Sequence, residues 1–402
     1  MAGISNRQMF LQHVAQTSEA PLGIEVQKAS GVMLTDIHGK EYIDLIAGIS
    51  VCNVGHCHPA VVKAVQEQAE KYMHVMVYGE YVETPQVAYA KLLTDHLPSS
   101  LNSVYFTNSG AEATEGAMKL AKRFTNRTNM IAFNKSYHGS TQGALSLIGD
   151  EYWRNAYRPL LPGIFHFDYG ANDVFEAIDE NTACVIVEPV QAESGVIVPP
   201  EGWLKKLRMH CNETGTLLVF DEIQTGFGRT GNLWAFEKNK IVPDILLLGK
   251  ALGGGMPLGA FISDVSIMHA LTVDPVLGHI TTFGGHPVSC AAGKAAFEIL
   301  ISENLCEQSE LKRSFLFDKL KHPAIKALRA AGLWMAIEFR DFSFNKKVID
   351  HCIANGLITD WFLFAPQCLR IGPPLTISNE ELTAAAGIIL QAIEFAASGN
   401  QA

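Results

Sequence analysis

Three runs of aliphatic residues that each end in a charged side chain constrain the fold of this chain more than any other feature. They occupy residues 183–190, 216–224 and 244–250, and the charged residues are Glu188, Asp221 and Lys250. Uninterrupted apolar runs of this kind are typical of strands buried on both faces of a parallel sheet. The carboxyl ends of such strands face a common ligand crevice. The sequence therefore predicts an α/β fold with these charged groups at one crevice.

Lys250 stands between a predicted buried strand and a glycine-rich loop, residues 253–259. Glycines let the backbone approach a ligand closely, because they carry no side chain. A lysine and a carboxylate presented together indicate an electrophilic cofactor. Pyridoxal phosphate uses both, because its aldehyde takes a lysine amine and an acid keeps its ring nitrogen protonated. Taken alone, Lys250 would instead be interpreted as a strand-end lysine that reaches solvent.

A phosphate site is predicted where Asn108-Ser109-Gly110 follows a short apolar segment. We expect a helix over residues 111–124, with Ser109 as its N-cap and Glu112 placed as in a capping box. Free N–H groups and the positive end of the helix dipole attract phosphate at such a terminus. The alternative is an ordinary capped helix, so the phosphate site depends on the presence of Asp221 and Lys250.

Seven motifs in this order make the chain resemble the class III (subgroup II) pyridoxal-phosphate aminotransferases of fold type I. They lie at residues 36–59, 108–113, 137–139, 188–195, 221–231, 281–287 and 369–375, so the resemblance covers nearly the whole chain. This group includes the 4-aminobutyrate, ornithine and acetylornithine aminotransferases. The resemblance implies a large, doubly wound, mostly parallel lobe with a smaller α+β lobe. It also implies ping-pong transfer of an amino group from an ω-amino donor to a 2-oxo acid.

The resemblance assigns cofactor roles to matching positions. Lys250 would form the internal aldimine and then move the proton, which requires an amine with a lowered pKa. Asp221 would pair with the pyridinium nitrogen, Gln224 would contact the phenolic oxygen, and Tyr137 would stack on the ring. Thr282 would reach the phosphate of a neighbouring subunit, which implies a homodimer or a higher oligomer. The remaining cofactor contacts implied are Ser109, Gly110, Ala111, His138, Glu188 and Ile223.

Substrate roles follow from the same resemblance. Arg370 would hold a carboxylate through two parallel hydrogen bonds, a geometry that lysine cannot offer. Glu193 would act as a switch that pairs with Arg370 when an ω-amine is bound and releases it for the α-carboxylate of the oxo acid. Tyr78, Tyr81 and Ile49 would line the pocket.

Ser140 departs from the family pattern. An arginine that holds a distal carboxylate usually follows the aromatic-His-Gly step, whereas here Tyr137-His-Gly is followed by Ser140 and Thr141. Arg154 and Arg158 lie in a predicted loop and are candidates to replace it, although ordinary surface charges are the simpler interpretation. The alternative function is therefore an ω-amine or β-amino acid aminotransferase that uses pyruvate or glyoxylate.

The sequence favours transamination over three other functions. A decarboxylase, aminomutase or racemase shares the fold and the Asp221–Lys250 pair, but Glu193 favours an enzyme that alternates two substrates. A nucleotide-binding dehydrogenase or kinase is disfavoured because Lys250 precedes its glycines and no Gly-x-Gly-x-x-Gly opens the first unit. A catalytically inactive binding protein is disfavoured because Lys250, Asp221 and Arg370 are all present.

Length and composition set broader expectations. A chain of 402 residues predicts two lobes, which we divide into an N-terminal segment 1–50 that packs with the small lobe, a cofactor domain 51–287 and a small domain 288–402. The net charge of −10 disfavours nucleic acid or an anionic membrane as partner. No apolar run was expected to be long enough to span a bilayer, and the N-terminus has no signal layout, so we expect a cytoplasmic enzyme. The eight cysteines form no Cys-x-x-Cys pair, and His56-Cys57-His58 finds no second ligand cluster, so no metal is predicted.

Periodicity predicts most of the regular elements. Helices are expected at residues 59–71, 288–301, 345–355 and 379–397, and a strand at residues 367–371. Short strands are expected around residues 32–46, and residues 326–339 are assigned to the small lobe.

Overall fold

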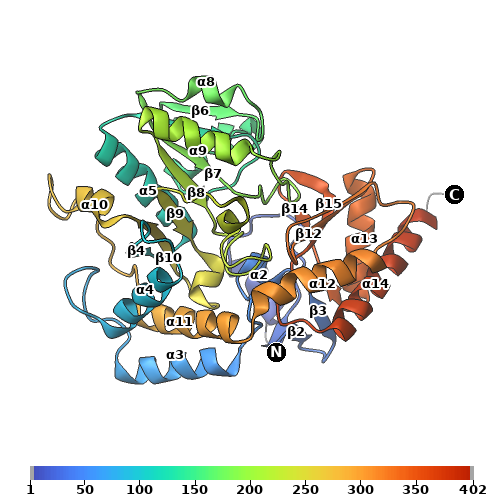
Figure 1. The fold of residues 1–402 in the computed structure, drawn as a ribbon. Helices are drawn as coiled ribbons and strands as arrows, with labels where there is room; N and C mark the ends of the chain where they lie inside the picture. The colour runs from blue at the N-terminus through green and yellow to red at the C-terminus, as the bar shows by residue number, and fades with distance from the viewer. Residues whose placement is uncertain (1–3, 399–402) are drawn as a thin grey trace.

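The computed structural model describes residues 4–398 and contains three sheets. The largest has seven strands and fills the left half of Figure 1. Its strands run from β9 to β6 in parallel, whereas β10 pairs antiparallel with both β9 and β4. The predicted mostly parallel sheet is therefore confirmed. Its spatial order is β4 (Ser103–Thr107), β10 (Gly259–Ser263), β9 (Ile245–Leu248), β8 (Leu217–Asp221), β7 (Thr182–Val187), β5 (Asn129–Phe133) and β6 (Ile164–Phe167).

The central strands β7, β8 and β9 are buried along their whole length. Successive side chains of a strand point to opposite faces, so each strand contributes to two separate apolar cores. One core packs Leu217 and Val219 of β8 against α5 (Gly110–Thr125), while Leu218 and Phe220 belong to the other core. Both faces of the sheet are thus covered, as in a doubly wound lobe.

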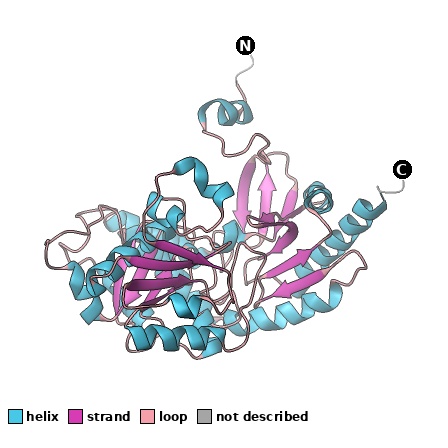
Figure 2. Cartoon of the chain, turned by 90° about the horizontal axis from the view of Figure 1, so that it is seen from above, coloured by secondary structure: helices cyan, strands magenta, loops and turns pink. Residues whose placement is uncertain are grey.

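The N-terminal strands join a strand from the far end of the chain. β1 (Val26–Ser30), β2 (Met33–Asp36) and β3 (Glu41–Asp44) form a sheet in which β3 pairs in parallel with β13 (Leu357–Ile358). This sheet lies beside the C-terminal sheet, as Figure 2 shows. The third sheet has the order β11 (Ala327–Ala330), β12 (Met335–Glu338), β15 (Ala365–Ile371) and β14 (Trp361–Phe362).

The helix α11 (Pro287–Ser302) begins where the cofactor domain was predicted to end. It packs against α3 (Pro59–Lys71) and α4 (Thr84–Asp95), both within the predicted cofactor domain (Figure 1). It is followed by α12 (Leu305–Lys319), which contacts the C-terminal helix. α11 therefore packs mainly on elements of the predicted cofactor domain and leads into α12.

The C-terminal helix α14 (Asn379–Ser398) corrects the expectation that no segment is long and apolar enough to cross a membrane. By length and composition it meets that criterion, and it is the one helix within residues 4–398 that does. Its buried side chains pack against α12 and α13 (Phe342–Ala354). Packed core helices meet the same criterion. The buried residues are Leu382, Ala385, Ala386, Ile389, Ala392, Ile393 and Ala396.

The predicted helices and the strand at 367–371 are all present within a few residues. The helix expected at 345–355 starts earlier, because Asp341 caps it by accepting a hydrogen bond from the Phe344 N–H at 2.8 Å. Residues 326–339 contain β11 and β12, and α12 was not predicted. The remaining elements are α1 (Asn6–His13), α2 (Ala47–Ser50), α6 (Gln142–Ser146), α7 (Glu151–Arg154), η1 (Asn155–Tyr157), α8 (Val174–Ala177), α9 (Trp203–Thr214), η2 (Ala235–Asn239), η3 (Lys250–Gly253), α10 (Val265–Met268) and η4 (His269–Leu271).

Candidate active site

The three charged residues that were predicted to share one crevice lie together at the carboxyl edge of the large sheet. Asp221 ends β8 and pairs with Leu247 of the neighbouring strand β9, and Lys250 follows that strand as the first residue of η3. Glu188 directly follows β7. All three side chains line one cavity of about 490 Å³. The parallel register therefore brings together groups that lie far apart in the sequence.

The amino end of α5 forms one wall of this cavity. The Ser109 hydroxyl caps the helix by accepting a hydrogen bond from the Glu112 N–H at 3.2 Å. The Glu112 carboxylate accepts from the Asn108 N–H at 2.9 Å, so the return bond of the capping box falls one residue earlier than predicted. A Cβ on Gly110 would lie only 2.8 Å from the Ile223 side chain. Gly110 lines the cavity, and Ile223 leaves no room for a side chain at this position.

Asp221 is held by two hydrogen bonds on different oxygens. His138 Nδ1 lies 2.7 Å from Asp221 Oδ2, and the Ile223 N–H donates to Asp221 Oδ1 at 2.9 Å. Both side chains are buried. His138 Nε2 and the Gln224 side-chain oxygen have no hydrogen-bond partner among residues 4–398. Unpaired buried polar atoms are costly, so their presence beside the cavity indicates a polar ligand there.

Hydrogen bonds to Thr114 and Glu115 of α5 hold the loop that carries Tyr137 and Ser140. Thr114 donates its hydroxyl hydrogen bond to the His138 carbonyl at 3.0 Å. Glu115 accepts from the Thr141 hydroxyl at 2.7 Å and from the Gly143 N–H at 2.8 Å. The Tyr137 hydroxyl lies 3.0 Å from the Ser140 hydroxyl, and both residues line the cavity.

Burial shifts the ionisation of the charged groups. Burial lowers the pKa of the Lys250 amine to about 8, although the charge of Glu193 opposes this shift. Burial and the negative charge of Asp221 raise the pKa of Glu188 well above its usual range. The amine is therefore far easier to deprotonate than an exposed lysine, as a nucleophile and proton carrier requires.

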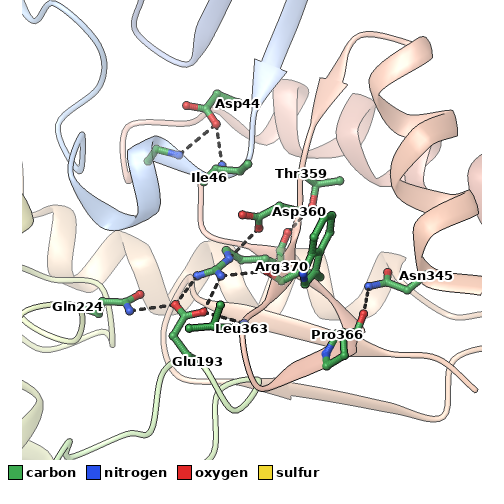
Figure 3. Close-up of polar contacts among 12 residues, drawn as sticks. Asp44, Ile46, Glu193, Gln224, Asn345, Thr359, Asp360, Leu363, Pro366 and Arg370 are labelled. Atoms are coloured by element: carbon green, nitrogen blue, oxygen red, sulfur yellow. Dashed lines mark hydrogen bonds and ion pairs between the residues drawn. The ribbon is translucent and has the colours of Figure 1, made fainter. Parts of the chain in front are cut away.

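A second cavity of about 620 Å³ shares Tyr137, Gln224 and Lys250 with the first. It contains an ion pair between Glu193 and Arg370, whose two hydrogen bonds are both 2.9 Å long (Figure 3). Both residues are buried. Burial alone would raise the pKa of Glu193, but the charge of Arg370 outweighs it and holds that pKa at about 2. The pair is therefore ionised throughout the physiological range.

Two further contacts orient Glu193. The Gln224 amide donates to its Oε1 at 3.1 Å, and the Leu363 N–H donates to its Oε2 at 3.0 Å (Figure 3). Ile49, which was expected to line the substrate pocket, also lines this second cavity. It lies in α2 with a φ of 62°, a left-handed conformation that a β-branched residue rarely adopts.

Three predicted residues lie outside both cavities of their own chain. The Tyr78 hydroxyl instead donates to the Val104 carbonyl at 3.1 Å, and Tyr81 is exposed. The assignment of Tyr78 and Tyr81 to the substrate pocket therefore stays a prediction. Thr282 is exposed, and its carbonyl lies 2.8 Å from His74 Nε2. Its role at the phosphate of a neighbouring subunit stays a prediction.

The arginines considered as replacements for the missing cation are engaged elsewhere. Arg154 ends the short helix α7 and pairs with Glu151, and Arg158 pairs with the same carboxylate at 2.8 Å. Neither lines the cavity that contains Ser140. His56, part of the rejected metal motif, has its Nε2 2.7 Å from Asp44 Oδ2.

The residues around the first cavity fit the predicted cofactor. The helix terminus at Ser109 and Gly110 can take the phosphate, because N–H groups and the helix dipole meet there. Asp221 can face a protonated ring nitrogen, and Lys250 can reach an aldehyde. The unpaired atoms of His138 and Gln224 also need polar partners. The donor set therefore matches pyridoxal phosphate.

Sequence reasoning missed Asp360. It lines the second cavity, and its carboxylate accepts a hydrogen bond from Arg370 Nε at 2.7 Å. Its signal in the sequence is a lone acid within the apolar stretch 357–364, ten residues before Arg370. A carboxylate in such a stretch requires a cation.

Comparisons with known proteins agree with this geometry. The family profile described as Aminotransferase class-III matches residues 14–393. The acetylornithine aminotransferase of Methanopyrus kandleri is 43% identical over 366 residues, which cover 90% of this chain and 92% of that protein. Ornithine aminotransferase 1 of Staphylococcus aureus is 37% identical over 383 residues, with 92% and 94% covered.

Solved structures give the same result. The ornithine aminotransferase of Toxoplasma gondii, described with partial occupancy of PLP at its active site, superposes with a TM-score of 0.91 at 32% identity. That match covers 98% of this chain and 94% of the other. An (S)-enantioselective omega-transaminase of Thermomicrobium roseum superposes with a TM-score of 0.89 at 28% identity, covering 98% of each chain.

Proposed function

Since this chain belongs to the class III aminotransferases, we propose that it moves an amino group from an ω-amino donor of the ornithine or acetylornithine type to a 2-oxo acid. It is a pyridoxal-phosphate enzyme. When bound, this cofactor withdraws electrons from the carbon that carries the amine, so that a proton can leave it. The remaining chemistry belongs to residues of the chain.

The single observation that carries the proposal is the Glu193–Arg370 pair in a cavity that Lys250 also lines. An ω-amine presents no carboxylate next to its reacting carbon, so Glu193 can stay on Arg370 and neutralise it. A 2-oxo acid does present one, and it can replace Glu193 on the same two guanidinium nitrogens. One pocket can thereby serve both substrates in turn.

Each polar group then has a distinct task. Lys250 carries the proton between carbons, because its lowered pKa makes the free amine available near neutral pH. Asp221 holds the positive charge at the ring nitrogen, and His138 holds Asp221 in orientation. Ser109 and the N–H groups that follow it bind the phosphate. These roles for individual residues are part of the proposal.

A short acceptor, pyruvate or glyoxylate, is favoured over 2-oxoglutarate by the residues at the loop 140–141. Ser140 and Thr141 bring only hydroxyl groups to the cavity, and Arg154 and Arg158 are paired with Glu151. A distal carboxylate would be buried there without a cation, which is unfavourable. A rate with 2-oxoglutarate above the rate with pyruvate would contradict this choice.

We propose that two copies of the chain associate through the loops 73–82 and 273–283. The two loops are joined by the contact between His74 Nε2 and the Thr282 carbonyl. Contiguous exposed apolar side chains are typical of subunit interfaces. Light scattering at micromolar concentration would give twice the chain mass. The exposed apolar residues are Met73, Val75, Tyr81, Val82, Val273, Val276, Leu277, Ile280 and Phe283.

The donor is tested by the visible absorbance of the purified holoenzyme, without any oxo acid. Ornithine, N-acetylornithine, 4-aminobutyrate and L-alanine are added one at a time. Loss of the cofactor's visible band with at least one ω-amine is expected, and the fastest donor names the substrate class. A band that responds only to L-alanine would overturn the ω-amino donor. A protein that takes up no cofactor would overturn the site.

A further inference from the structure

Arg370 is held by other residues in addition to Glu193. Its Nη1 and Nη2 donate to Glu193, and its Nε donates to Asp360 at 2.7 Å. Nη2 also donates to the Trp361 carbonyl at 3.1 Å, and the guanidinium lies 4.4 Å from the centre of the Phe362 ring. The guanidinium thus has one edge facing Glu193 and the other edge fixed by the segment 360–362 (Figure 3).

The position of Asp360 is set by the backbone that precedes β14. The Arg370 N–H donates to the Asp360 carbonyl at 2.9 Å, and the Thr359 hydroxyl donates to the Arg370 carbonyl at 2.6 Å. These bonds place residues 359–360 alongside Arg370, so the Asp360 carboxylate lies beside the Nε of the same residue. This pairing keeps the Asp360 backbone beside Arg370, whereas Glu193 belongs to a different segment.

The two carboxylates differ in what they can do. Glu193 covers the two Nη nitrogens, the edge that a substrate carboxylate needs, while Asp360 binds only Nε. The Asp360 side chain is 26% exposed and lines the second cavity, whereas the Arg370 side chain is 4% exposed. If Asp360 were absent, the buried guanidinium would have no ionic partner among residues 4–398 after Glu193 leaves and before a substrate carboxylate arrives. Such a loss is costly in a buried site.

We propose, on the basis of the proposed function, that Asp360 is a positioning residue that keeps Arg370 in place and charge-compensated when Glu193 gives way to a substrate α-carboxylate. Without Asp360, Arg370 is free to follow Glu193 out of the carboxylate site. With an ω-amine bound, Glu193 itself holds Arg370, and Asp360 matters less. Loss of Asp360 should therefore affect the half-reaction with an α-carboxylate substrate more than the half-reaction with an ω-amine, and Asp360 acts through Arg370 rather than on the substrate.

The test compares Asp360→Ala, Asp360→Asn and wild-type holoenzyme in single half-reactions followed by cofactor absorbance. The first arm uses substrates with an α-carboxylate: L-alanine in one direction, and pyruvate with the aminated enzyme in the reverse direction. The other arm uses the fastest of ornithine, N-acetylornithine and 4-aminobutyrate. For Asp360→Ala we expect the apparent Kd of L-alanine and pyruvate to rise roughly tenfold or more, the scale of one lost charge-assisted hydrogen bond. The limiting rate and the ω-amine arm should change less than about twofold.

Asp360→Asn keeps an oxygen that can accept from Arg370 Nε, so its Kd should rise less than that of the alanine variant. Asp318→Asn is the control, because Asp318 is an exposed carboxylate outside both cavities whose partner is Lys321, 3.6 Å away. It should behave as wild type in both arms. Thermal unfolding midpoints separate a loss of fold from a loss of positioning.

The role of Asp360 would be overturned if Asp360→Ala raised the apparent Kd by the same factor in both arms. An unchanged Kd for L-alanine and pyruvate would overturn it as well. Failure of the proposed function looks different, because wild-type enzyme would then ignore every ω-amine. In that case the L-alanine and pyruvate arm still decides the role of Asp360. A rise in Kd without a fall in the limiting rate supports it, and a fall in rate alone contradicts it.

Discussion

His138 Nδ1 lies 2.7 Å from Asp221 Oδ2, and both side chains are buried at the carboxyl edge of the large sheet. The imidazole thereby fixes the plane of the carboxylate, while the Ile223 N–H holds its other oxygen. Asp221 is proposed to face the ring nitrogen of the cofactor. This hydrogen bond therefore sets the orientation of the charged carboxylate toward that nitrogen.

Asp221→Asn should leave the cofactor bound but slow both half-reactions by roughly 100-fold, the scale of one removed preorganised electrostatic partner. The amide keeps the shape of the side chain but loses the charge and one of the two oxygens that contact His138 and the Ile223 N–H. His138→Gln should have a smaller effect, because the charge stays and only its orientation is released. Stopped-flow absorbance gives both rates. Wild-type rates in Asp221→Asn would remove Asp221 from the mechanism.

Lys250→Ala should abolish the attachment of cofactor that borohydride makes permanent, because the attacking amine is removed. Mass spectrometry of the reduced protein gives the readout. Lys346→Ala is the matched control, since Lys346 lines the second cavity but is paired with Asp350. A reduced adduct that persists in Lys250→Ala would move the attachment to another lysine.

Reattachment of pyridoxal phosphate to cofactor-free protein should accelerate as pH rises from 6 to about 8 and then level off. The direction follows because burial lowers the pKa of Lys250 to about 8 from its ordinary 10.5. The neutral amine attacks the aldehyde, so the rate follows its fraction. A rate that keeps rising to pH 10 would show that Lys250 titrates as an exposed lysine does.

Glu193→Ala should impair the ω-amine half-reaction more than the L-alanine half-reaction, by roughly tenfold. With an ω-amine bound, Arg370 would keep Asp360 but lose the carboxylate on its two Nη nitrogens. An α-carboxylate instead supplies that partner itself. Equal losses in the two half-reactions would end the switch hypothesis. Asp360→Ala is expected to impair the L-alanine half-reaction more than the ω-amine half-reaction, which is the opposite of the effect of Glu193→Ala.

Much of the site was predictable because it depends on strand ends. Asp221 and Lys250 each follow an aliphatic run, and parallel pairing of β8 with β9 then places them side by side. Ser109 was predictable for a similar reason, since helix capping is a local property of sequence. The positions of these residues depend on strand ends and helix caps, and both can be recognised from neighbouring residues in the sequence.

Other parts depend on contacts that no local pattern encodes. Asp360 reaches Arg370 through the pairing of residues 359–361 with β15, and that register is invisible in the sequence. Tyr78 was assigned to the pocket by resemblance alone, whereas its position is set by contacts with β4. The helix α12 was missed because its apolar and charged residues form no clear stripe.

The Glu193–Arg370 pair also joins the two lobes, because Glu193 follows a strand of the large sheet and Arg370 belongs to β15 of the C-terminal sheet (Figure 3). The Phe364 N–H donates to the Glu193 carbonyl at 2.9 Å, and Arg329 Nε donates to the Gly195 carbonyl at 2.8 Å. These flanking bonds do not involve the Glu193 side chain, so the proposed movement of that side chain would leave the loop joined to the C-terminal lobe. Under the proposed switch, the two lobes are joined by one more ion pair when an ω-amine is bound than when an oxo acid is bound.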